Sequence, residues 1–434
     1  MNWNQQIDDR DVTIGVIGLG YVGLPLALAF AEEGFQILGF DVDETKVRSL
    51  QEGESPIPDI SSDRVAGGLE TGTFNATADM SRLSGVDVIS ICVPTPLRKS
   101  RDPDISHIAE ATETIVEYFE PPGLVVLEST TYPGTTEEIL SERFRDAGWD
   151  LSEDVFLAFS PERIDPSNEE FSIRNTPKVV GGITDRAGDI TEDLYGTIVD
   201  QIVRVSNTRA AEMVKLLENT FRSINIGLAN EMALICNRLD LDVWEVIDAA
   251  ATKPYGFMPF YPGPGLGGHC IPVDPLFLSW KAKLADTQSR FVELADEVNR
   301  SMPDHVVQKT TEALNEDQKC VNGAKICILG VAYKSNVDDV RESPAHEIVS
   351  HLRDLHADLT YCDPYVDSFS VEGERVESVA RADLPNESFD AGVIVTDHDR
   401  FDWPQDSEQF PLLVDTRNAL ADLRDQASAR VVVL

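Results

Sequence analysis

The first part of the chain alternates short apolar runs with longer amphipathic stretches. An apolar run over 12–17 leads into Gly18-Leu19-Gly20-Tyr21-Val22-Gly23, a helical stretch over 24–33 ends at Gly34, and a second apolar run follows over 35–40. This order predicts a strand-helix-strand unit. Repetition of the pattern predicts a parallel, doubly wound sheet. The further predicted strands are 86–93, 124–129, 155–159 and 178–180, with a helix over 105–118.

The pattern changes near residue 206. Residues 208–239 have the period of one long helix, with Met213, Leu217, Ile224 and Leu228 on an apolar stripe. Shorter helices are predicted over 243–251 and beyond Pro275. We interpret this part as a helical spine that packs on the domains beside it and on a second subunit, which predicts a homodimer or a higher homo-oligomer.

Alternation of strands and helices returns after Asn322-Gly323 and predicts a second, smaller α/β domain. Its predicted elements are strands over 325–331, 358–362, 391–395 and 412–414 and a helix over 344–356. The predicted domains are therefore 1–205, 206–318 and 319–434.

The glycine hexad follows a strand, opens a helix and precedes Asp41 at the end of the second strand by about 20 residues. In that context Gly18 makes the tight turn, Gly20 admits a pyrophosphate and Gly23 lets the helix pack on the strand. Asp41 would bind the adenosine ribose and repel a 2′-phosphate. The pattern predicts an NAD-binding domain and, for the whole chain, an α/β fold of two Rossmann-like doubly wound domains joined by a long central helix and helical spine.

The chain of 434 residues carries a net charge of −40, from 76 acidic and 36 basic residues. Such acidity argues against nucleic acid as a partner. Because self-repulsion is screened at high salt, we interpret the acidity as a halophilic surface.

The six cysteines show no spacing typical of a metal site or a disulfide framework, so no metal is predicted. The first residues lack a basic region followed by an apolar run, and no stretch has the length of a spanning helix. A cytoplasmic protein without a membrane partner is expected.

Cys270 lies in a run rich in glycine and proline, Gly263-Pro264-Gly265-Leu266-Gly267-Gly268-His269-Cys270-Ile271-Pro272. Such a run predicts a shaped loop in which backbone can approach a ligand closely. A thiol there is a candidate nucleophile, and it can equally be a small buried hydrophobe.

Polar residues at three predicted strand ends suggest a ligand crevice: Val93-Pro94-Thr95-Pro96, Glu128-Ser129-Thr130-Thr131 and Ser160-Pro161-Glu162. On the long helix, Lys215, Asn219 and Arg222 share one face. Lysine is scarce in this chain, so Lys215 within an apolar segment is interpreted as functional.

These residues resemble the UDP-glucose/GDP-mannose dehydrogenase family over nearly the whole chain. The resemblance rests on GLGYVGLP, VPTP, ESTTYPGTT, SPER, the helix with Lys215 and Asn219, GPGLGGHCIPVDP, and Tyr333-Lys334 with the segment 339–344. Within the family, the segment from Thr252 to Pro264 is most similar to the UDP-N-acetylglucosamine 6-dehydrogenase branch. Nucleotide uronic acids of this kind commonly feed surface glycans.

The resemblance implies oxidation of a sugar C6 alcohol to a carboxylate with two NAD. Cys270 would attack the aldehyde to give a thiohemiacetal, whose oxidation gives a thioester. Lys215 and Asn219 would stabilise the oxyanion at C6, and Asp274 would orient water or share a proton with Lys215. Glu162 would be the base for thioester hydrolysis and Thr130 would hold its water.

The resemblance also implies binding positions. Lys334 and Arg341 would meet the UDP, and Lys253 stands near the position where UDP-glucose enzymes carry an arginine. Implied cofactor contacts are Gly18, Gly20, Tyr21, Val22, Gly23, Asp41, Thr95 and Thr130; implied substrate contacts are Glu162, Lys215, Asn219, Lys253, Tyr261, Gly267, Lys334 and Arg341.

Three alternatives remain open at this point. The substrate could be UDP-glucose or UDP-N-acetyl-D-mannosamine rather than UDP-N-acetyl-D-glucosamine. A two-electron NAD-dependent hydroxyacid or alcohol dehydrogenase would leave Cys270 a structural role. A nucleotide-sugar or NAD sensor without turnover would need only the glycines and Asp41.

Overall fold

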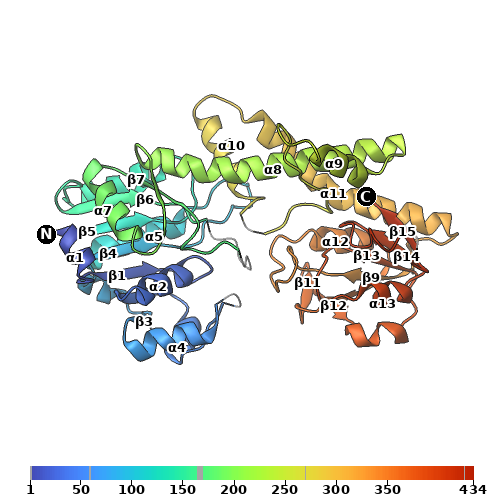
Figure 1. Ribbon diagram of the computed structural model, residues 1–434, viewed down its shortest axis with the longest axis horizontal. Coiled ribbons are helices and arrows are strands. Elements are labelled where there is room, and N and C mark those ends of the chain that lie inside the picture. The colour runs from blue at the N-terminus through green and yellow to red at the C-terminus, as the bar shows by residue number, and fades with distance from the viewer. Residues whose placement is uncertain (1, 58–59, 164–169, 269, 425) are drawn as a thin grey trace. The chain divides into compact units, whose positions relative to one another are not determined.

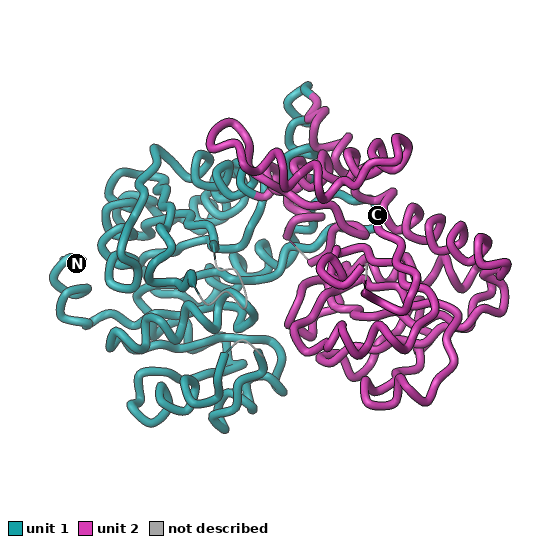
Figure 2. Tube along the Cα trace, turned by 45° about the vertical axis from the view of Figure 1, so that its right-hand side comes forward, with its two compact units in different colours: residues 1–218, 276–287 teal, residues 219–275, 288–434 magenta. Residues whose placement is uncertain are grey.

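The computed structural model describes residues 2–57, 60–163, 170–268, 270–424 and 426–434. The chain forms two compact units, coloured separately in Figure 2. Unit 1 consists of Met1–Glu218 and Leu276–Thr287, and unit 2 of Asn219–Pro275 and Gln288–Leu434. The predicted division into three domains along the sequence stays a prediction.

Unit 1 contains an eight-stranded sheet in the order β3-β2-β1-β4-β5-β6-β7-β8, drawn in blue to green in Figure 1. The first pairings follow the predicted strand-helix-strand unit, with Ile14 opposite Ile37 in parallel register. The strands are β1 (Thr13–Ile17), β2 (Gln36–Phe40), β3 (Phe74–Thr77), β4 (Val88–Ile91), β5 (Gly123–Leu127), β6 (Val155–Phe159), β7 (Lys178–Gly182) and β8 (Ile202–Arg204).

Both faces of this sheet are covered, as the continuous apolar character of its strands predicts. In β5, Leu124 and Val126 belong to one core cluster, whereas Val125 and Leu127 belong to another. The first cluster includes side chains of α1 (Trp3–Asp8), α2 (Gly23–Glu32), α3 (Glu44–Gln51), α4 (Ser62–Thr71) and α7 (Asp185–Tyr195). The second includes side chains of η1 (Met80–Gly85), α5 (Ser106–Tyr118), η2 (Thr136–Ser141) and α6 (Glu142–Asp146).

One strand of unit 1 departs from the predicted parallel sheet. β7 pairs antiparallel with β6, with Phe159 opposite Gly181, while β8 is parallel to β7. The described part of the connection between β6 and β7 contains no helix. Antiparallel neighbours need no crossover, which is the physical reason that the chain can reverse here.

The helical part contains α8 (Thr208–Leu239), α9 (Val243–Ala251), α10 (Asp274–Leu284) and α11 (Arg290–Glu316). The bounds of α8 and α9 are those predicted. Met213, Leu217 and Leu228 of the predicted apolar stripe are more than a third exposed. Within unit 2, α8 meets α11 closely, because a Cβ at Gly227 would lie 3.2 Å from Ala295.

Unit 2 contains a seven-stranded sheet in the order β11-β12-β10-β9-β13-β14-β15. It is parallel except for the pair β11 and β12. Ile326 and Ile328 of β9 face one core cluster, and Cys327 and Leu329 face another. The elements are β9 (Lys325–Leu329), α12 (Ala345–Asp354), β10 (Asp358–Cys362), β11 (Phe369–Val371), β12 (Glu374–Ser378), η3 (Arg381–Asn386), β13 (Ala391–Ile394), α13 (Trp403–Asp406), η4 (Ser407–Gln409), β14 (Leu412–Asp415) and β15 (Arg430–Val433).

The predicted fold class is confirmed: two α/β sheets of Rossmann-like order and a long central helix. The prediction missed β3, β8, β11 and β15, which lie at sheet edges, and β12, which pairs with the edge strand β11. Among the described residues, no helix combines the length and the apolar character needed to cross a membrane.

Candidate active site

The glycine hexad forms the turn between β1 and α2. Gly18 has a φ of +93°, and a Cβ there would lie 2.6 Å from the Cys92 carbonyl oxygen. A Cβ at Gly23 would lie 1.8 Å from the Gly18 carbonyl oxygen, whereas a Cβ at Gly20 would meet nothing within 4 Å. Gly18 and Gly23 are thus required by the protein's own packing, and Gly20 leaves open space. This geometry fits a pyrophosphate at the helix N-terminus.

Asp41 follows β2 and is 7% exposed. Its carboxylate accepts hydrogen bonds from Leu19 N at 2.9 Å and Asp43 N at 3.0 Å, and it forms an ion pair with Lys46 at 2.7 Å. Asp41 therefore also fixes the glycine turn itself. Tyr21 and Val22 within that turn are half-buried.

The segments that follow β4 and β5 are joined by side-chain hydrogen bonds. Thr95 Oγ1 donates to the Thr130 carbonyl at 2.7 Å, and Ser129 Oγ donates to the Val93 carbonyl at 2.7 Å. The structure thus brings together the two threonines that the sequence placed at separate strand ends.

Lys215 and Glu162 also lie together in unit 1. Lys215 Nζ donates to the Glu162 backbone carbonyl at 2.6 Å, and Arg163 N donates to Glu162 Oε1 at 2.6 Å. Lys178 Nζ lies 3.8 Å from Glu162 Oε2. Glu162 is 9% exposed, so its carboxylate is placed among cations and donors with little water around it.

Cys270 of unit 2 is half-buried in the turn that leads into α10. Its carbonyl accepts hydrogen bonds from Val273 N at 3.2 Å and Asp274 N at 2.8 Å. The backbone carbonyl of Cys270 thus accepts hydrogen bonds from the amides that precede and open α10 (Asp274–Leu284). Asn219 of α8 donates through its side-chain amide to the buried Asp274 carboxylate.

The glycines before Cys270 are required by contacts within unit 2. A Cβ at Gly267 would lie 2.6 Å from Tyr333 Cβ, and Gly268 has a φ of +77°. Gly268 N donates to the Arg341 carbonyl at 3.2 Å. The loop that carries the thiol is therefore packed directly against the segment 333–344.

The predicted substrate-binding cations differ in their surroundings. The Arg341 guanidinium pairs with Asp339, with Nη2 2.6 Å from Oδ2, and Lys334 is half-buried. Lys253 is exposed and lies 5.2 Å from the centre of the Tyr255 ring. Tyr261 donates to Asp248 of α9 at 2.8 Å. Tyr261 therefore contacts α9 directly, and Lys253 contacts Tyr255 in the segment just after α9.

Three residues of these surroundings were not predicted from the sequence. Arg417 follows β14 and its Nε donates to the Val395 carbonyl at 2.8 Å. Burial lowers the pKa of Arg417 to about 10, against the attraction of Asp397 and Asp415. A Cβ at Gly263 would lie 2.7 Å from the Arg417 guanidinium. The sequence signal for Arg417 was its position after a predicted strand end, and the same signal identified the other strand-end residues.

The other two missed residues are Lys178 and Glu212, both buried in unit 1. Glu212 of α8 accepts hydrogen bonds from Gly134 N at 2.5 Å, Thr136 N at 2.9 Å and Thr136 Oγ1 at 2.7 Å. It attaches the ESTTYPGTT segment to α8 one turn before Lys215. A glutamate in a helix gives no sequence signal for such a contact.

Three family models match consecutive parts of the chain. They describe the NAD binding domain, the central domain and the UDP binding domain of the UDP-glucose/GDP-mannose dehydrogenase family, over residues 12–199, 209–301 and 327–422. The chain belongs to this family. It therefore has the family's NAD-binding and UDP-binding domains, and the family resemblance inferred from the motifs is confirmed.

Individual relatives cover most of the chain. The UDP-N-acetyl-D-mannosamine dehydrogenase of Pyrococcus horikoshii is 34% identical over 415 residues, 94% of this chain and 96% of that protein. The UDP-N-acetyl-D-glucosamine 6-dehydrogenase of Pseudomonas aeruginosa is 33% identical over 361 residues, 82% of this chain and 84% of that protein. A solved structure of the Pyrococcus horikoshii UDP-D-ManNAc dehydrogenase aligns with a TM-score of 0.87, 33% identity and coverage of 97% and 99%.

Proposed function

We propose that this protein oxidises the C6 hydroxyl of a UDP-N-acetylhexosamine to the carboxylate in two successive two-electron steps, with Cys270 as the covalent nucleophile. The observation that carries the proposal is the position of Cys270. It lies in the turn just before α10, where its carbonyl accepts from Asp274 of the Asn219–Asp274 pair, and in a loop packed against the UDP-binding domain. In sum, alcohol, two NAD and water give carboxylate, two NADH and three protons.

The NAD-binding residues would be Gly18, Gly20, Tyr21, Val22, Gly23, Asp41, Thr95 and Thr130. When bound, NAD accepts the hydride that leaves C6 in each oxidation. The open space at Gly20 and the amides at the start of α2 suit the pyrophosphate, and the fixed Asp41 carboxylate suits the ribose hydroxyls.

Cys270 acts after the first oxidation. Its sulfur bonds to the aldehyde carbon to form a thiohemiacetal, and loss of a hydride and a proton from that adduct leaves a thioester. Lys215 and Asn219 stabilise the negative charge on the C6 oxygen, and Asp274 accepts from Asn219 and holds its amide. A protein without this thiol would stop at the aldehyde.

Hydrolysis of the thioester completes the reaction. Glu162 takes a proton from water as the water oxygen bonds to the thioester carbon, and the C–S bond then breaks to return the Cys270 thiolate. Thr130, joined to Thr95, holds the water. The buried setting of Glu162 among donors supports this role.

The sugar is proposed to carry an N-acetyl group at C2. The relatives that are named for N-acetylmannosamine and for N-acetylglucosamine both support this class, and the segment from Thr252 to Pro264 supports the glucosamine branch. Lys334, Arg341 and Arg417 would meet the diphosphate or ribose, and Gly267 lets backbone approach the ligand. Lys253 and Tyr261 would lie at the sugar end.

The test is the stoichiometry of NADH formation at 340 nm in concentrated KCl with UDP-N-acetylmannosamine, UDP-N-acetylglucosamine and UDP-glucose in turn. We expect two NADH per sugar with one of the two N-acetylhexosamine substrates. Cys270→Ser should still bind NAD and UDP-sugar but stall at the second oxidation. One NADH per sugar with activity intact in Cys270→Ala would instead indicate a two-electron dehydrogenase, and binding heat without absorbance change would indicate a sensor.

A further inference from the structure

Three charged side chains are buried together at one edge of the sheet in unit 1. Glu128 follows β5, Glu162 follows β6 and Lys178 is the first residue of β7; they are 1%, 9% and 6% exposed. The antiparallel register of β6 and β7, with Ala158 opposite Gly182 and Phe159 opposite Gly181, places residue 178 opposite residue 162 when continued. A parallel β7 would carry this lysine to the other end of the strand.

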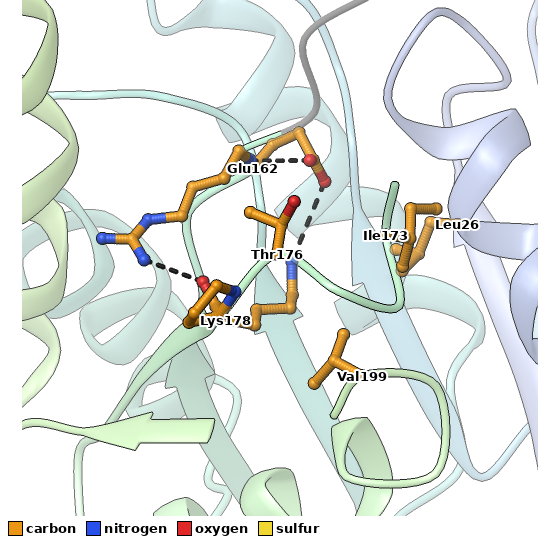
Figure 3. Close-up of a pocket in the computed structure, with 8 residues that line it drawn as sticks. Leu26, Glu162, Ile173, Thr176, Lys178 and Val199 are labelled. Atoms are coloured by element: carbon orange, nitrogen blue, oxygen red, sulfur yellow. Dashed lines mark hydrogen bonds and ion pairs between the residues drawn. The ribbon is translucent and has the colours of Figure 1, made fainter. Parts of the chain in front are cut away.

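Lys178 contacts both carboxylates. Its Nζ lies 2.8 Å from Glu128 Oε2 and 3.8 Å from Glu162 Oε2, and it donates to the Pro161 carbonyl at 3.5 Å. Figure 3 shows the Lys178 side chain reaching toward the Glu162 carboxylate. On its other side, Tyr195 of α7 donates its hydroxyl to Glu128, and its ring centre lies 5.0 Å from the ammonium.

The ammonium of Lys178 lies in poorly solvated surroundings. A cavity of about 20 Å³ adjoins Lys178 and Glu162, with Leu26, Ile173 and Val199 among its lining (Figure 3). Such a volume holds about one water. Burial alone would lower the pKa of Lys178, but the carboxylates of Glu128 and Glu162 outweigh it and raise the pKa, so the ammonium stays charged.

Other polar groups near Glu162 have identified partners. Lys215 donates to the Glu162 backbone carbonyl, and the Arg163 guanidinium pairs with Glu218 and donates to the Pro177 carbonyl. Burial, followed by Glu128 and Glu162, raises the pKa of the Cys92 thiol, which is therefore neutral here. Lys178 is a cation that an ion pair places against the Glu162 carboxylate.

We infer that Lys178 is a positioning residue that orients the Glu162 carboxylate for thioester hydrolysis, and that Glu128 and Tyr195 hold Lys178 in that position. This rests on the proposed function. Glu128 and Glu162 both contact the Lys178 ammonium, so removing Glu128 and removing Lys178 change the charge around Glu162 in opposite directions.

These opposite effects of removing Glu128 and removing Lys178 provide a test, because a purely structural role of Lys178 would not produce them. The variants are Glu128→Gln and the double variant Glu128→Gln/Lys178→Met, which avoids leaving a buried charge unpaired. With UDP-N-acetylmannosamine or UDP-N-acetylglucosamine, whichever the wild type oxidises, rapid quenching and intact mass measure the Cys270 acyl-enzyme from about pH 5 to pH 9. The readout is the acid limb of the pH profile, that is, the pH at which the rate of thioester hydrolysis falls on the acidic side.

We expect the acid limb to move to lower pH in Glu128→Gln, and to higher pH by about one unit or more in the double variant relative to Glu128→Gln. The acyl-enzyme should accumulate in the double variant. Lys178→Arg, which keeps the charge, should leave the limb near that of wild type, and Tyr195→Phe, which keeps the charges, should change the rate more than the limb.

Two results would overturn the inference, and they are distinguishable. If wild type forms the acyl-enzyme and two NADH, but the limb stays in place in both variants, Lys178 does not act through Glu162. If wild type forms one NADH and no Cys270 adduct, the proposed function fails and the inference fails with it.

Discussion

The side-chain amide of Asn219 donates a hydrogen bond to the carboxylate of Asp274, 55 residues further along the chain. Asp274 is buried, and its backbone amide donates to the carbonyl of Cys270. One hydrogen bond therefore joins the helix that carries Lys215 and Asn219 to the turn that carries the thiol. In the proposed mechanism, this hydrogen bond orients the Asn219 amide that stabilises the negative charge on the C6 oxygen.

Asn219 and Asp274 act as one unit, so the decreases in kcat caused by Asn219→Ala and Asp274→Ala should not be additive. We expect each single variant to lower kcat by about 10²-fold or more, and the double variant to lose much less than the product. The resulting coupling should be about 1 to 3 kcal/mol. The measurement is NADH formation under saturating UDP-sugar.

Asn225→Ala is the matched control for this cycle. Asn225 lies on the same helix and donates its side-chain amide to the exposed Phe221 carbonyl, so kcat should stay close to that of wild type. Strictly additive losses in the two site variants would show that the hydrogen bond does not matter for turnover.

Glu212 predicts a pH dependence of stability. Burial raises the pKa of Glu212 to about 7 in the folded protein, against its three hydrogen bonds, from an ordinary 4.5. The folded state then holds the proton more tightly than the unfolded state. The protonated Glu212 carboxyl therefore contributes to the free energy of unfolding in full below pH 4.5, and this contribution is lost as the pH rises through about 7. The loss amounts to about 3 kcal/mol.

We therefore expect the free energy of unfolding of wild type, relative to Glu212→Gln, to fall between about pH 4.5 and pH 7 and to stay constant above. Denaturant titrations at constant high salt measure it. Glu70→Gln, which alters an exposed carboxylate of α4, should give a flat difference. A flat difference for Glu212→Gln as well would contradict the burial argument.

The sequence predicted the elements with strong local signals. α8 was predicted with its observed bounds, and the glycine turn has the geometry that its spacing indicates, with Gly20 open and Gly23 against Gly18. The sequence did not show the reversal of β7, because strand direction depends on a connection rather than on the strand's own residues. Lys178 was therefore not connected with Glu162.

Long-range contacts explain the other differences. Glu212 and Arg417 are ordinary charged residues in sequence, and their significance arises from Thr136 and Gly263, which lie far away along the chain. The stripe on α8 was predicted as an apolar pattern, and Met213 and Leu217 of that stripe are exposed in the single chain. Periodicity shows which face of a helix is apolar but not what covers that face.

The acidic surface predicts dependence on salt. The net charge is −40, and among the described residues most acidic side chains are not buried. Their repulsion is screened over about 10 Å at 0.1 M salt and about 3 Å at 1 M. We expect the Tm to rise by at least about 5 °C from dilute buffer to molar KCl, which corresponds to more than about 1 kcal/mol.

Sucrose is the control for the salt experiment, because it favours the compact state by exclusion and does not screen charge. At equal osmolality it should raise the Tm less than KCl does. Equal stability in dilute buffer and in molar KCl would mean that the acidity has no role in adaptation to salt.

The exposed apolar face of α8 in unit 2 predicts self-association. Phe221, Leu228, Ile235 and Leu239 lie at spacings of seven, seven and four residues, hence on one side of the helix, and they are 48%, 53%, 43% and 63% exposed. A contiguous apolar face of this kind marks an interface, and a second copy of the same helix is the simplest complement. We therefore expect the protein to have twice the mass of one chain in light scattering at high salt.

Leu228→Glu should shift the mass toward that of one chain, because an unpaired carboxylate would be buried at the contact. Leu355→Glu alters a comparably exposed leucine after α12 and should leave the dimer intact. A wild-type protein with the mass of one chain at micromolar concentration would contradict self-association through this face.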